Sequence, residues 1–526
     1  MKSSRLWLWG LTACGVLVAM VRNRGTVDFD EDETRYFELG ESLARHVYAL
    51  DVEQVFLHLV GTYRPPLLVI SDALALLLMT PSPHGLSVVR VAWLGLLLWA
   101  VSGIAGDVAR RSGMGSWDAE RSRVIAMVLA ATSPAVLLLA GSLMSEVPLA
   151  ALFACSVRLL LALDESPSDR NAAALGAVVG AAMLVKWTLP VSLAVPALVA
   201  VLASSQRAAM LRLGSFAVAV AAAVAGPWYL LAGGRVATFV FSVGQGEGAQ
   251  AFGAAERAPL GDALYYAGVL GWELLVVPLA VLAAAGSLTA LRRGLRGRAV
   301  LFASVLGPAL LFSLLANKEI RYLLPALGVW CALGGVGLAS LSAGTAGRSW
   351  SRFLQPAPLA LLGLLGVAAA HLSGDDEPFP YRRATPDDLP VETIDAVVQA
   401  LNPGGIRRAA VMSPEPWLWT PLWAQGVEAN AWTRWQAAWC APHLMDEAAF
   451  FLVASPQGTM EHCATDGQNS LAKFEELRAE LEPIQRWSGG GKDLVLLVHR
   501  ERLLSRPDAT VPGPLLSRPD ATEPDR

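Results

Sequence analysis

Long apolar runs recur along most of this chain, and they constrain its fold more than any other feature. Each run is close to the ~20 residues that a helix needs to cross the ~30 Å hydrocarbon core of a bilayer. Hydrophobic residues make up 54% of the chain and charged residues 16%, which is typical of an α-helical polytopic membrane protein. We predict about eleven spans, at residues 6–21, 87–109, 122–140, 146–163, 172–187, 189–204, 211–232, 264–286, 299–316, 321–342 and 354–372.

The charged loops predict which ends of these spans share a side of the membrane. The first run follows Lys2 and Arg5 without a small-x-small cleavage site, so we expect an uncleaved span and a cytoplasmic N-terminus. The apolar stretch 66–80 reaches only ~22 Å as a helix, and counting it as a span would turn the arginine-rich loops outward. We expect it to be an interfacial or re-entrant helix, which places the C-terminal region on the outer face.

Net charge and cysteine usage exclude other classes. The net charge of −4 on 526 residues predicts no nucleic-acid partner. The five cysteines show no metal-binding spacing. Cys14, Cys155 and Cys331 fall in apolar runs, where cysteine is usually a small buried hydrophobe. Cys440 and Cys463 lie in the C-terminal region and could pair if it faces an oxidising compartment.

Acidic residues crowd directly after the first run, in the long outer loop 22–86. Five carboxylates occupy residues 28–33, and a solvated acidic collar is the common explanation of such a run. The predicted topology brings further ionisable residues to the same face, namely Glu146, Lys186 and Arg321. Because such residues at bundle ends are costly unless they are paired or used, the set predicts a functional site there.

The outer loop has the pattern of two amphipathic helices that suit the headgroup plane of a membrane. The first covers residues 33–47 and the second runs from about Asp51 to Val60. Asp32 stands where an N-cap is expected, so part of its role could be structural. On the first helix Glu41 points away from the apolar face, which carries Tyr36, Leu39, Leu43 and Val47.

Several motifs on this face resemble those of the polyprenyl-phosphate-sugar-dependent GT-C glycosyltransferases. That family includes lipid A aminoarabinose transferases, protein O-mannosyltransferases and lipopolysaccharide galacturonosyltransferases. The resemblance covers about residues 1–372 and rests on Asp32-Glu33-Thr34-Arg35-Tyr36, Tyr63-Arg64-Pro65-Pro66-Leu67, Arg90, Ser145–Leu149, Gly180–Lys186, Pro227-Trp228-Tyr229 and Arg321–Pro325.

This resemblance implies a GT-C-like catalytic membrane domain over residues 1–372, in a bacterial inner membrane. It implies transfer of a sugar, with inversion, from a polyprenyl-phosphate donor. The expected acceptor is a cell-envelope glycolipid, a glycan or a protein.

The reaction needs a base for the acceptor hydroxyl and cations for the leaving phosphate. Asp32 is the candidate base, as the resemblance also implies, and Glu33 is the second catalytic candidate. Glu146 is a candidate for positioning the acceptor or a metal, with helix capping as the alternative. Lys186 is a candidate phosphate ligand, with a snorkelling lysine as the alternative. Further substrate-binding candidates are Arg35, Tyr63, Arg64, Arg321 and Tyr322, although tyrosines also form aromatic belts at interfaces.

One departure from the family pattern bears on a metal cofactor. The resemblance implies that the aminoarabinose-type enzymes carry Glu-Lys before the proline of the first loop, where the glutamate helps to hold a metal. Here the matching pair is Tyr63-Arg64, and residues 233–263 contain no histidine. We therefore expect a mechanism without a bound zinc, in which Glu33 would be a ligand only if a divalent ion binds.

The rest of the chain gives weaker signals. Residues 233–263 are rich in glycine and alanine and predict a flap over bound lipid or sugar, or a plain linker. Residues 373–502 predict a small α/β domain, and residues 503–526 contain a direct repeat typical of a disordered tail. In the α/β domain we expect helices at 391–401 and 471–481 and strands at 408–412, 450–454 and 494–498. Six tryptophans between positions 417 and 439 fit core packing or sugar stacking.

A transporter or flippase of a lipid-linked or amphipathic substrate is the rival function. It predicts internal repeats and charged or broken helices near the bilayer midplane. Here the mid-span positions are almost wholly apolar and the ionisable residues lie at one rim. The pattern favours the enzyme.

Overall fold

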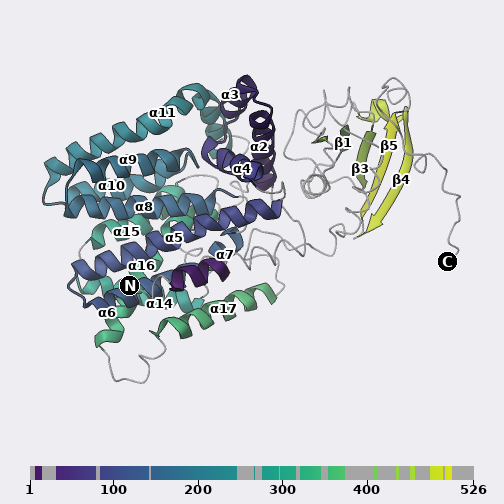
Figure 1. Ribbon diagram of the computed structural model, residues 1–526. Helices are drawn as coiled ribbons and strands as arrows, with labels where there is room; N and C mark the ends of the chain where they lie inside the picture. Colours follow the sequence, from purple (N-terminus) through teal and green to yellow (C-terminus); the bar gives the residue numbers. More distant parts are fainter. Residues whose placement is uncertain are drawn as a thin grey trace. The chain divides into compact units, whose positions relative to one another are not determined.

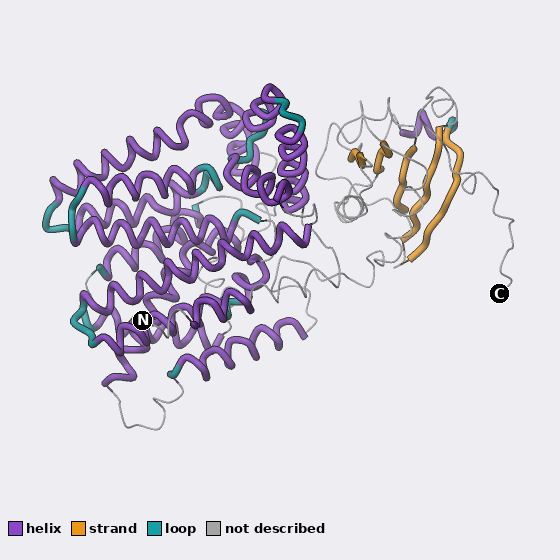
Figure 2. The backbone as a smooth tube through the Cα atoms, viewed as in Figure 1, coloured by secondary structure: helices purple, strands orange, loops and turns teal. Residues whose placement is uncertain are grey.

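The chain forms two compact units, one built from helices and one that carries the strands, as the colours of Figure 2 distinguish. The computed structural model describes residues 6–14, 31–78, 83–140, 144–245, 266, 275, 277–294, 297–314, 320–344, 354–372, 408–412, 434–437, 450–455, 474–489 and 492–499.

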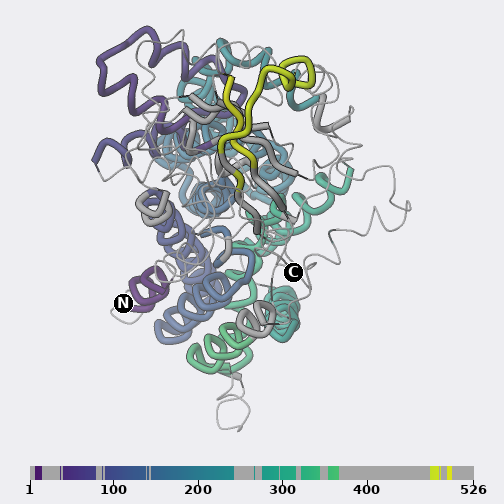
Figure 3. The backbone as a smooth tube through the Cα atoms, turned by 90° about the vertical axis from the view of Figure 1, so that its right-hand side faces the viewer, coloured from purple at the N-terminus to yellow at the C-terminus, as the bar shows by residue number. Residues whose placement is uncertain are grey.

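The helical unit is a bundle whose longest members run side by side (Figure 1). Several are seen end-on in the side view of Figure 3, so their axes are close to parallel. The long helices are α5 (Pro83–Arg111), α8 (Glu146–Glu165), α9 (Asp169–Met183), α10 (Leu189–Ala203), α11 (Arg207–Gln245), α14 (Val277–Arg292), α15 (Arg298–Ser313), α16 (Leu324–Gly344) and α17 (Pro356–Leu372). The centre is α16, which packs against α6 (Ser116–Ala131), α8, α14 and α15, and whose apolar segment is wholly buried.

Four described helices are long and apolar enough to cross a membrane, so the protein is an integral membrane protein. They cover Val89–Arg111, Glu146–Glu165, Arg207–Phe241 and Arg321–Ala343. Five shorter apolar helices accompany them, at Pro66–Leu78, Leu189–Ala203, Val277–Arg292, Arg298–Ser313 and Pro356–Leu365. Of the first predicted span, residues 6–14 are helical and the remainder lies outside the described residues. The count of eleven spans stays a prediction.

The predicted span 122–140 is wrong as a single helix. It is divided into α6, which ends at Ala131, and α7 (Pro134–Ala140). Proline has no N–H for the helical ladder and disfavours a helical residue before it, so Pro134 begins a new helix. The Ser133 hydroxyl caps that helix by accepting a hydrogen bond from the N–H of Val136 at 3.3 Å.

The predicted span 211–232 and the predicted flap after it also need correction. Helix α11 runs without interruption to Gln245, so the first part of the 233–263 loop is helical; residues 246–263 lie outside the described residues. The reason is packing: Ala232 and Val236 continue the buried face of Trp228 into this segment. Of the span predicted at 264–286, the second part is α14, which covers Val277–Arg292; most of residues 264–276 lie outside the described residues.

The first outer loop forms three short helices gathered at one end of the bundle (Figure 1). They are α2 (Glu31–Tyr48), α3 (Val52–Val60) and α4 (Pro66–Leu78). In α3, Asp51 is the N-cap and accepts a hydrogen bond from the N–H of Gln54 at 3.1 Å. Helix α4 has 13 residues, a length of ~20 Å.

The amphipathic pattern of α2 is partly corrected. Tyr36 and Leu43 are buried as predicted, but Val47 is exposed and Glu41, predicted to point away, is buried. The buried face therefore follows residues 36, 40 and 43–44 and includes Glu41, whose carboxylate pairs with Arg45 one turn later.

His58 connects α3 to α2. Its Nε2 donates a hydrogen bond to the Leu39 carbonyl at 2.9 Å. Burial lowers the pKa of His58, the hydrogen bond raises it, and the nearby His46 lowers it again. The net lowering of the pKa favours the neutral imidazole at pH 7.

The second unit contains a five-stranded sheet in the order β2-β1-β3-β5-β4. Its strands are β1 (Arg408–Met412), β2 (Arg434–Ala437), β3 (Phe450–Ser455), β4 (Leu481–Gly489) and β5 (Lys492–His499). β1 pairs in parallel with β2 and β3, whereas β5 pairs antiparallel with β3 and β4.

Three of these strands confirm predicted ones, whereas β2 and β4 were missed. The helix predicted at 471–481 is wrong in its last part: of its described residues 474–478 are helical, and β4 begins at Leu481. The helix predicted at 391–401, Cys440, Cys463 and the tail lie outside the described residues.

Glycines set how closely the central helices approach. A Cβ built on Gly337 of α16 would overlap the backbone carbonyl of Gly286 on α14, and one on Gly335 would overlap the backbone of Ala126 on α6. Small residues at such crossings let membrane helices make extensive van der Waals contact.

We expect Gly337→Ala to lower the free energy of unfolding by at least about 1–3 kcal/mol, because α14 and α16 would have to separate. Gly214→Ala is the matched control: Gly214 lies in α11 with no atom within 4 Å of a built Cβ. Removing a glycine there should be neutral or stabilise by about 0.5–1 kcal/mol. Thermal unfolding of both variants in detergent tests this, and equal midpoints would contradict it.

Candidate functional site

Three charged side chains from separate elements meet at one end of the bundle. Lys186 Nζ lies 2.6 Å from Oε1 of Glu146, and Arg321 Nε lies 3.7 Å from the same oxygen. The Glu146 side chain is only 2% exposed, whereas those of Lys186 and Arg321 are 16% and 15% exposed. Two partly accessible cations therefore share one buried carboxylate.

Helix ends place these residues. Glu146 is the first residue of α8, where the helix dipole favours a carboxylate. Lys186 lies in the turn after α9, and its N–H bonds the Ala182 carbonyl at 3.0 Å. The start of α4 holds that turn, because the Leu67 N–H donates to the Leu184 carbonyl at 2.9 Å. The Leu67 N–H lies at the start of α4 and the Leu184 carbonyl at the end of α9, where neither has a partner in its own helix. The bond between them therefore satisfies both groups.

Arg321 and Tyr322 belong to the short 3-10 helix η2 (Ile320–Leu323) that leads into α16. The Tyr322 ring stacks on Phe312 with centroids 5.3 Å apart, and Lys186 Nζ lies 5.6 Å from its centroid. The Tyr322 ring therefore lies beside Lys186, one of the predicted substrate-binding residues with which the sequence grouped Tyr322.

A second, fully buried ion pair lies next to this group. Arg90 of α5 donates from Nε to Asp72 of α4 at 3.0 Å, and a second bond from its Nη2 makes the pair bidentate. Arg90 also donates to the Met144 carbonyl at 3.2 Å, while the sulfur of Met144 lies 3.8 Å from Nη1 of Arg321. Met144 thus touches both charged groups just before α8 begins.

Tyr36 joins the first outer loop to the Asp72–Arg90 pair. The guanidinium carbon of Arg64 lies 4.8 Å from the centroid of the Tyr36 ring, and the guanidinium carbon of Arg90 lies 5.7 Å from it. Arg64 is buried and also lies 5.4 Å from the ring of Tyr63. Stacked guanidinium groups of this kind are held in fixed orientations.

Helix α11 anchors this loop from the other side. Tyr63 stacks on Phe239 with centroids 3.9 Å apart. Trp228 donates from Nε1 to the Leu59 carbonyl at 2.8 Å, and Arg235 donates to the Val60 carbonyl at 3.0 Å. Tyr63, predicted to bind substrate, is thus also a packing residue between the loop and α11.

The predicted catalytic residues Asp32 and Glu33, and Arg35 after them, lie in the first turns of α2. Their side chains lie outside the described part of the structure, so their catalytic and binding roles stay predictions. Tyr36, which follows them in the same helix, reaches the buried pair described above.

Sequence reasoning missed Asp72 and Met144, and it noted Arg90 only as a motif match. Asp72 had a usable signal: it is the sole charged residue in the apolar helix 66–78, and a carboxylate there needs a cationic partner. Met144 had no signal, because its backbone carbonyl and sulfur act only through their positions.

The described part of the site does not fit a metal ion. Its exposed charges are cations, and the Glu146 carboxylate is already bound to Lys186 and Arg321. Among the described residues, no group of three or more His, Cys, Asp or Glu side chains could hold a metal.

No known family profile matches this sequence, and no curated protein matches it significantly. Solved structures do match. The crystal structure of ArnT from Cupriavidus metallidurans in the apo state aligns with a TM-score of 0.60 and 16% identity, over 94% of this chain and 98% of that one. The chain has the GT-C fold.

Two further GT-C structures agree. ArnT from Cupriavidus metallidurans bound to undecaprenyl phosphate aligns with a TM-score of 0.56 and 15% identity, over 93% of this chain and 98% of that one. Arabinofuranosyltransferase AftD from Mycobacteria aligns with a TM-score of 0.53 and 17% identity, over 94% of this chain and 40% of that one. At these identities the similarity shows the fold.

We expect Asp72→Asn to lower the free energy of unfolding by about 3–5 kcal/mol, because it leaves the buried Arg90 without its counter-charge. Asp169→Asn is the control, since Asp169 is 78% exposed and pairs with an exposed Arg212 at 3.7 Å; its cost should stay below about 1 kcal/mol. Chemical unfolding in detergent measures both. Equal costs would show that the buried pair is not a structural requirement.

Proposed function

We propose that this protein is an integral-membrane glycosyltransferase. It transfers a sugar from a polyprenyl-phosphate donor to a cell-envelope glycolipid, glycan or protein acceptor. The observation that carries the proposal is the pair of accessible cations, Lys186 and Arg321, around the buried Glu146 in a chain with the GT-C fold. The similarity to a structure bound to undecaprenyl phosphate supports the donor class.

The cationic group suits the phosphate of such a donor. The departing polyprenyl phosphate gains negative charge as its bond to the sugar breaks, and fixed cations in a site shielded from water stabilise that charge. Glu146 holds Lys186 and Arg321 in place, and both cations are partly accessible. Arg64, Tyr63, Tyr322 and Arg35 are the further proposed phosphate and sugar contacts.

The proposed chemistry is a single displacement. The acceptor oxygen attacks the anomeric carbon, its proton passes to the Asp32 carboxylate, and the bond from that carbon to the phosphate oxygen breaks with the electron pair leaving on the phosphate. Attack opposite the leaving group inverts the anomeric centre. Glu33 is the second proposed catalytic carboxylate.

We place the reaction on the outer face of a bacterial inner membrane, with the N-terminus cytoplasmic, because the arginine-rich loops follow the positive-inside rule. Residues 1–372 form the proposed catalytic domain, and residues 373–502 the proposed domain on the same outer face.

We expect purified protein to transfer sugar from polyprenyl-phosphate donors to an envelope lipid extract, and Asp32→Asn to lose about 10²–10⁴-fold in rate. Asp30→Asn removes a carboxylate from the same acidic run and should keep most of the rate. Equal rates for the two variants would remove Asp32 as the base. If the wild type transfers nothing yet moves lipid-linked sugar across liposomes, the protein is a transporter.

We also expect Lys186→Gln to reduce turnover by about 10²–10³-fold, because the leaving phosphate loses a fixed cation. Lys186→Arg keeps the cation and should retain part of the activity and the melting temperature. Arg170→Gln, which removes an exposed charge at the start of α9, is the control for net charge. Unchanged turnover in a folded Lys186→Gln would contradict the proposed phosphate contact.

A further inference from the structure

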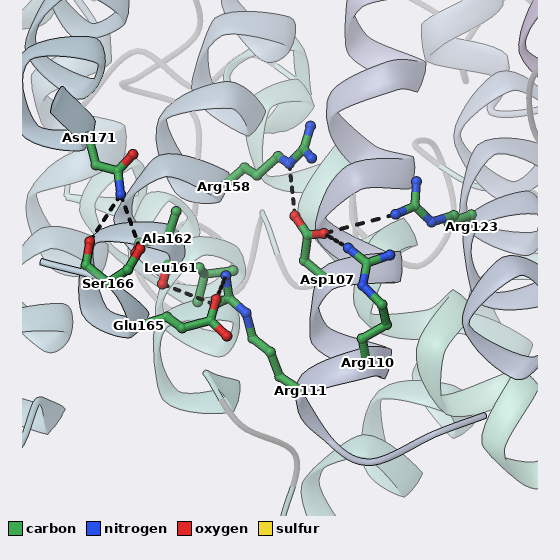
Figure 4. Close-up of polar contacts among 10 residues, drawn as sticks. All are labelled: Asp107, Arg110, Arg111, Arg123, Arg158, Leu161, Ala162, Glu165, Ser166 and Asn171. Carbon is green, nitrogen blue, oxygen red and sulfur yellow. Dashed lines mark hydrogen bonds and ion pairs between the residues drawn. The ribbon is translucent and has the colours of Figure 1, made fainter. Parts of the chain in front are cut away.

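A second charged cluster gathers around Asp107, away from the group at Glu146 (Figure 4 shows the cluster). Asp107, near the end of α5, is contacted by three arginines from three helices. Arg158 of α8 donates to it from Nε at 2.9 Å. Arg110, one turn later in α5, also donates to the Asp107 carboxylate, and Nη2 of Arg123 in α6 lies 3.9 Å from Oδ1 of Asp107. Asp107 lies 17 residues after Arg90 in α5, which corresponds to ~26 Å along the axis.

Two glycines of α5 let the arginines lie flat against its backbone. A Cβ built on Gly103 would overlap the guanidinium of Arg158, and one built on Gly106 would overlap that of Arg123. Close approach of this kind is possible only where the helix carries no side chain. The cluster is therefore built into the packing of α5, α6 and α8.

The carboxylates do not balance the arginines. Arg111 pairs with Glu165 at 2.6 Å, and Glu120 acts electrostatically on Arg123. With Asp107, three carboxylates face four arginines among the described residues of this cluster. Among the described residues, Arg123 has no hydrogen-bond acceptor, since its ion pair with Asp107 is longer than a hydrogen bond.

A cavity of about 200 Å³ opens between these groups, lined by Asp107, Arg110, Arg111 and Glu165. This volume is many times the ~10–15 Å³ that a single water needs. The cavity therefore has room for a phosphate group, and guanidinium donors that bind phosphate in bidentate fashion are at its wall.

We propose that this cluster binds the phosphate of an anionic phospholipid headgroup. Basic pockets between membrane helices on the cytoplasmic side are suited to such headgroups, and the positive-inside rule assigns these arginines to that side. The surroundings favour lipid over a soluble anion. Trp99 of α5 is 48% exposed, and the guanidinium carbon of Arg158 lies 4.7 Å from the centroid of its ring. Trp117, at the start of α6, is 76% exposed. Tryptophan is enriched at the headgroup level of membranes.

The test compares lipid binding by full-length variants in phosphatidylcholine nanodiscs with and without phosphatidylglycerol. For the wild type, phosphatidylglycerol should raise the melting temperature and remain bound through purification, as measured by mass spectrometry. Removing one arginine near an anionic headgroup weakens binding about fivefold. The single variant Arg110→Gln removes an arginine from the cavity wall and should show that loss, and the double variant Arg110→Gln/Arg111→Gln should bind about 25-fold more weakly.

A matched double variant, Arg207→Gln/Arg212→Gln, removes two exposed arginines from the start of α11 and should bind like the wild type. Equal phosphatidylglycerol binding by the two double variants would overturn the site. An equal rise in melting temperature with inorganic phosphate alone would overturn the assignment to lipid, since a soluble anion would then suffice. Sugar transfer is not the readout, so failure of the glycosyltransferase proposal would leave this result interpretable.

Discussion

The structure depends on how charge is buried where the helices end. A carboxylate removed from water is tolerated only with cations close by, and Glu146, at the start of a buried helix, meets Lys186 and Arg321 from two other elements. Satisfying Glu146 therefore fixes the turn after α9 and the entry to α16 relative to α8. One electrostatic requirement therefore brings together three segments that are far apart in the sequence.

Neighbouring contacts extend this arrangement. Met144 connects the cationic group to the Asp72–Arg90 pair, and the ring of Tyr36 connects that pair to the first outer loop. Buried ion pairs seldom add much net stability, but breaking one is costly. Asp72 and Arg90 therefore hold α4 against α5 in one orientation.

The two ends of the bundle use the same physics in different ways. At one end two cations surround one carboxylate, and at the other three arginines surround Asp107. Between the two ends the helices are apolar and pack closely where glycines meet. Such a distribution suits chemistry and recognition at the membrane surfaces and does not resemble the midplane site of a transporter.

The sequence by itself determined the class of the protein, because apolar runs of span length have no other stable solution in water or in lipid. Motif order also predicted the GT-C fold and the meeting of Glu146, Lys186, Arg321 and Tyr322, since each begins or ends a span on one predicted face. Helix boundaries were predicted less well: Pro134 divides one span, and packing around Trp228 extends α11 into a glycine-rich segment. Only the tertiary structure decided that Asp72 pairs with Arg90 and that Asp107 gathers three arginines. Those partners come from different helices, and their distances depend on where glycines allow the helices to approach.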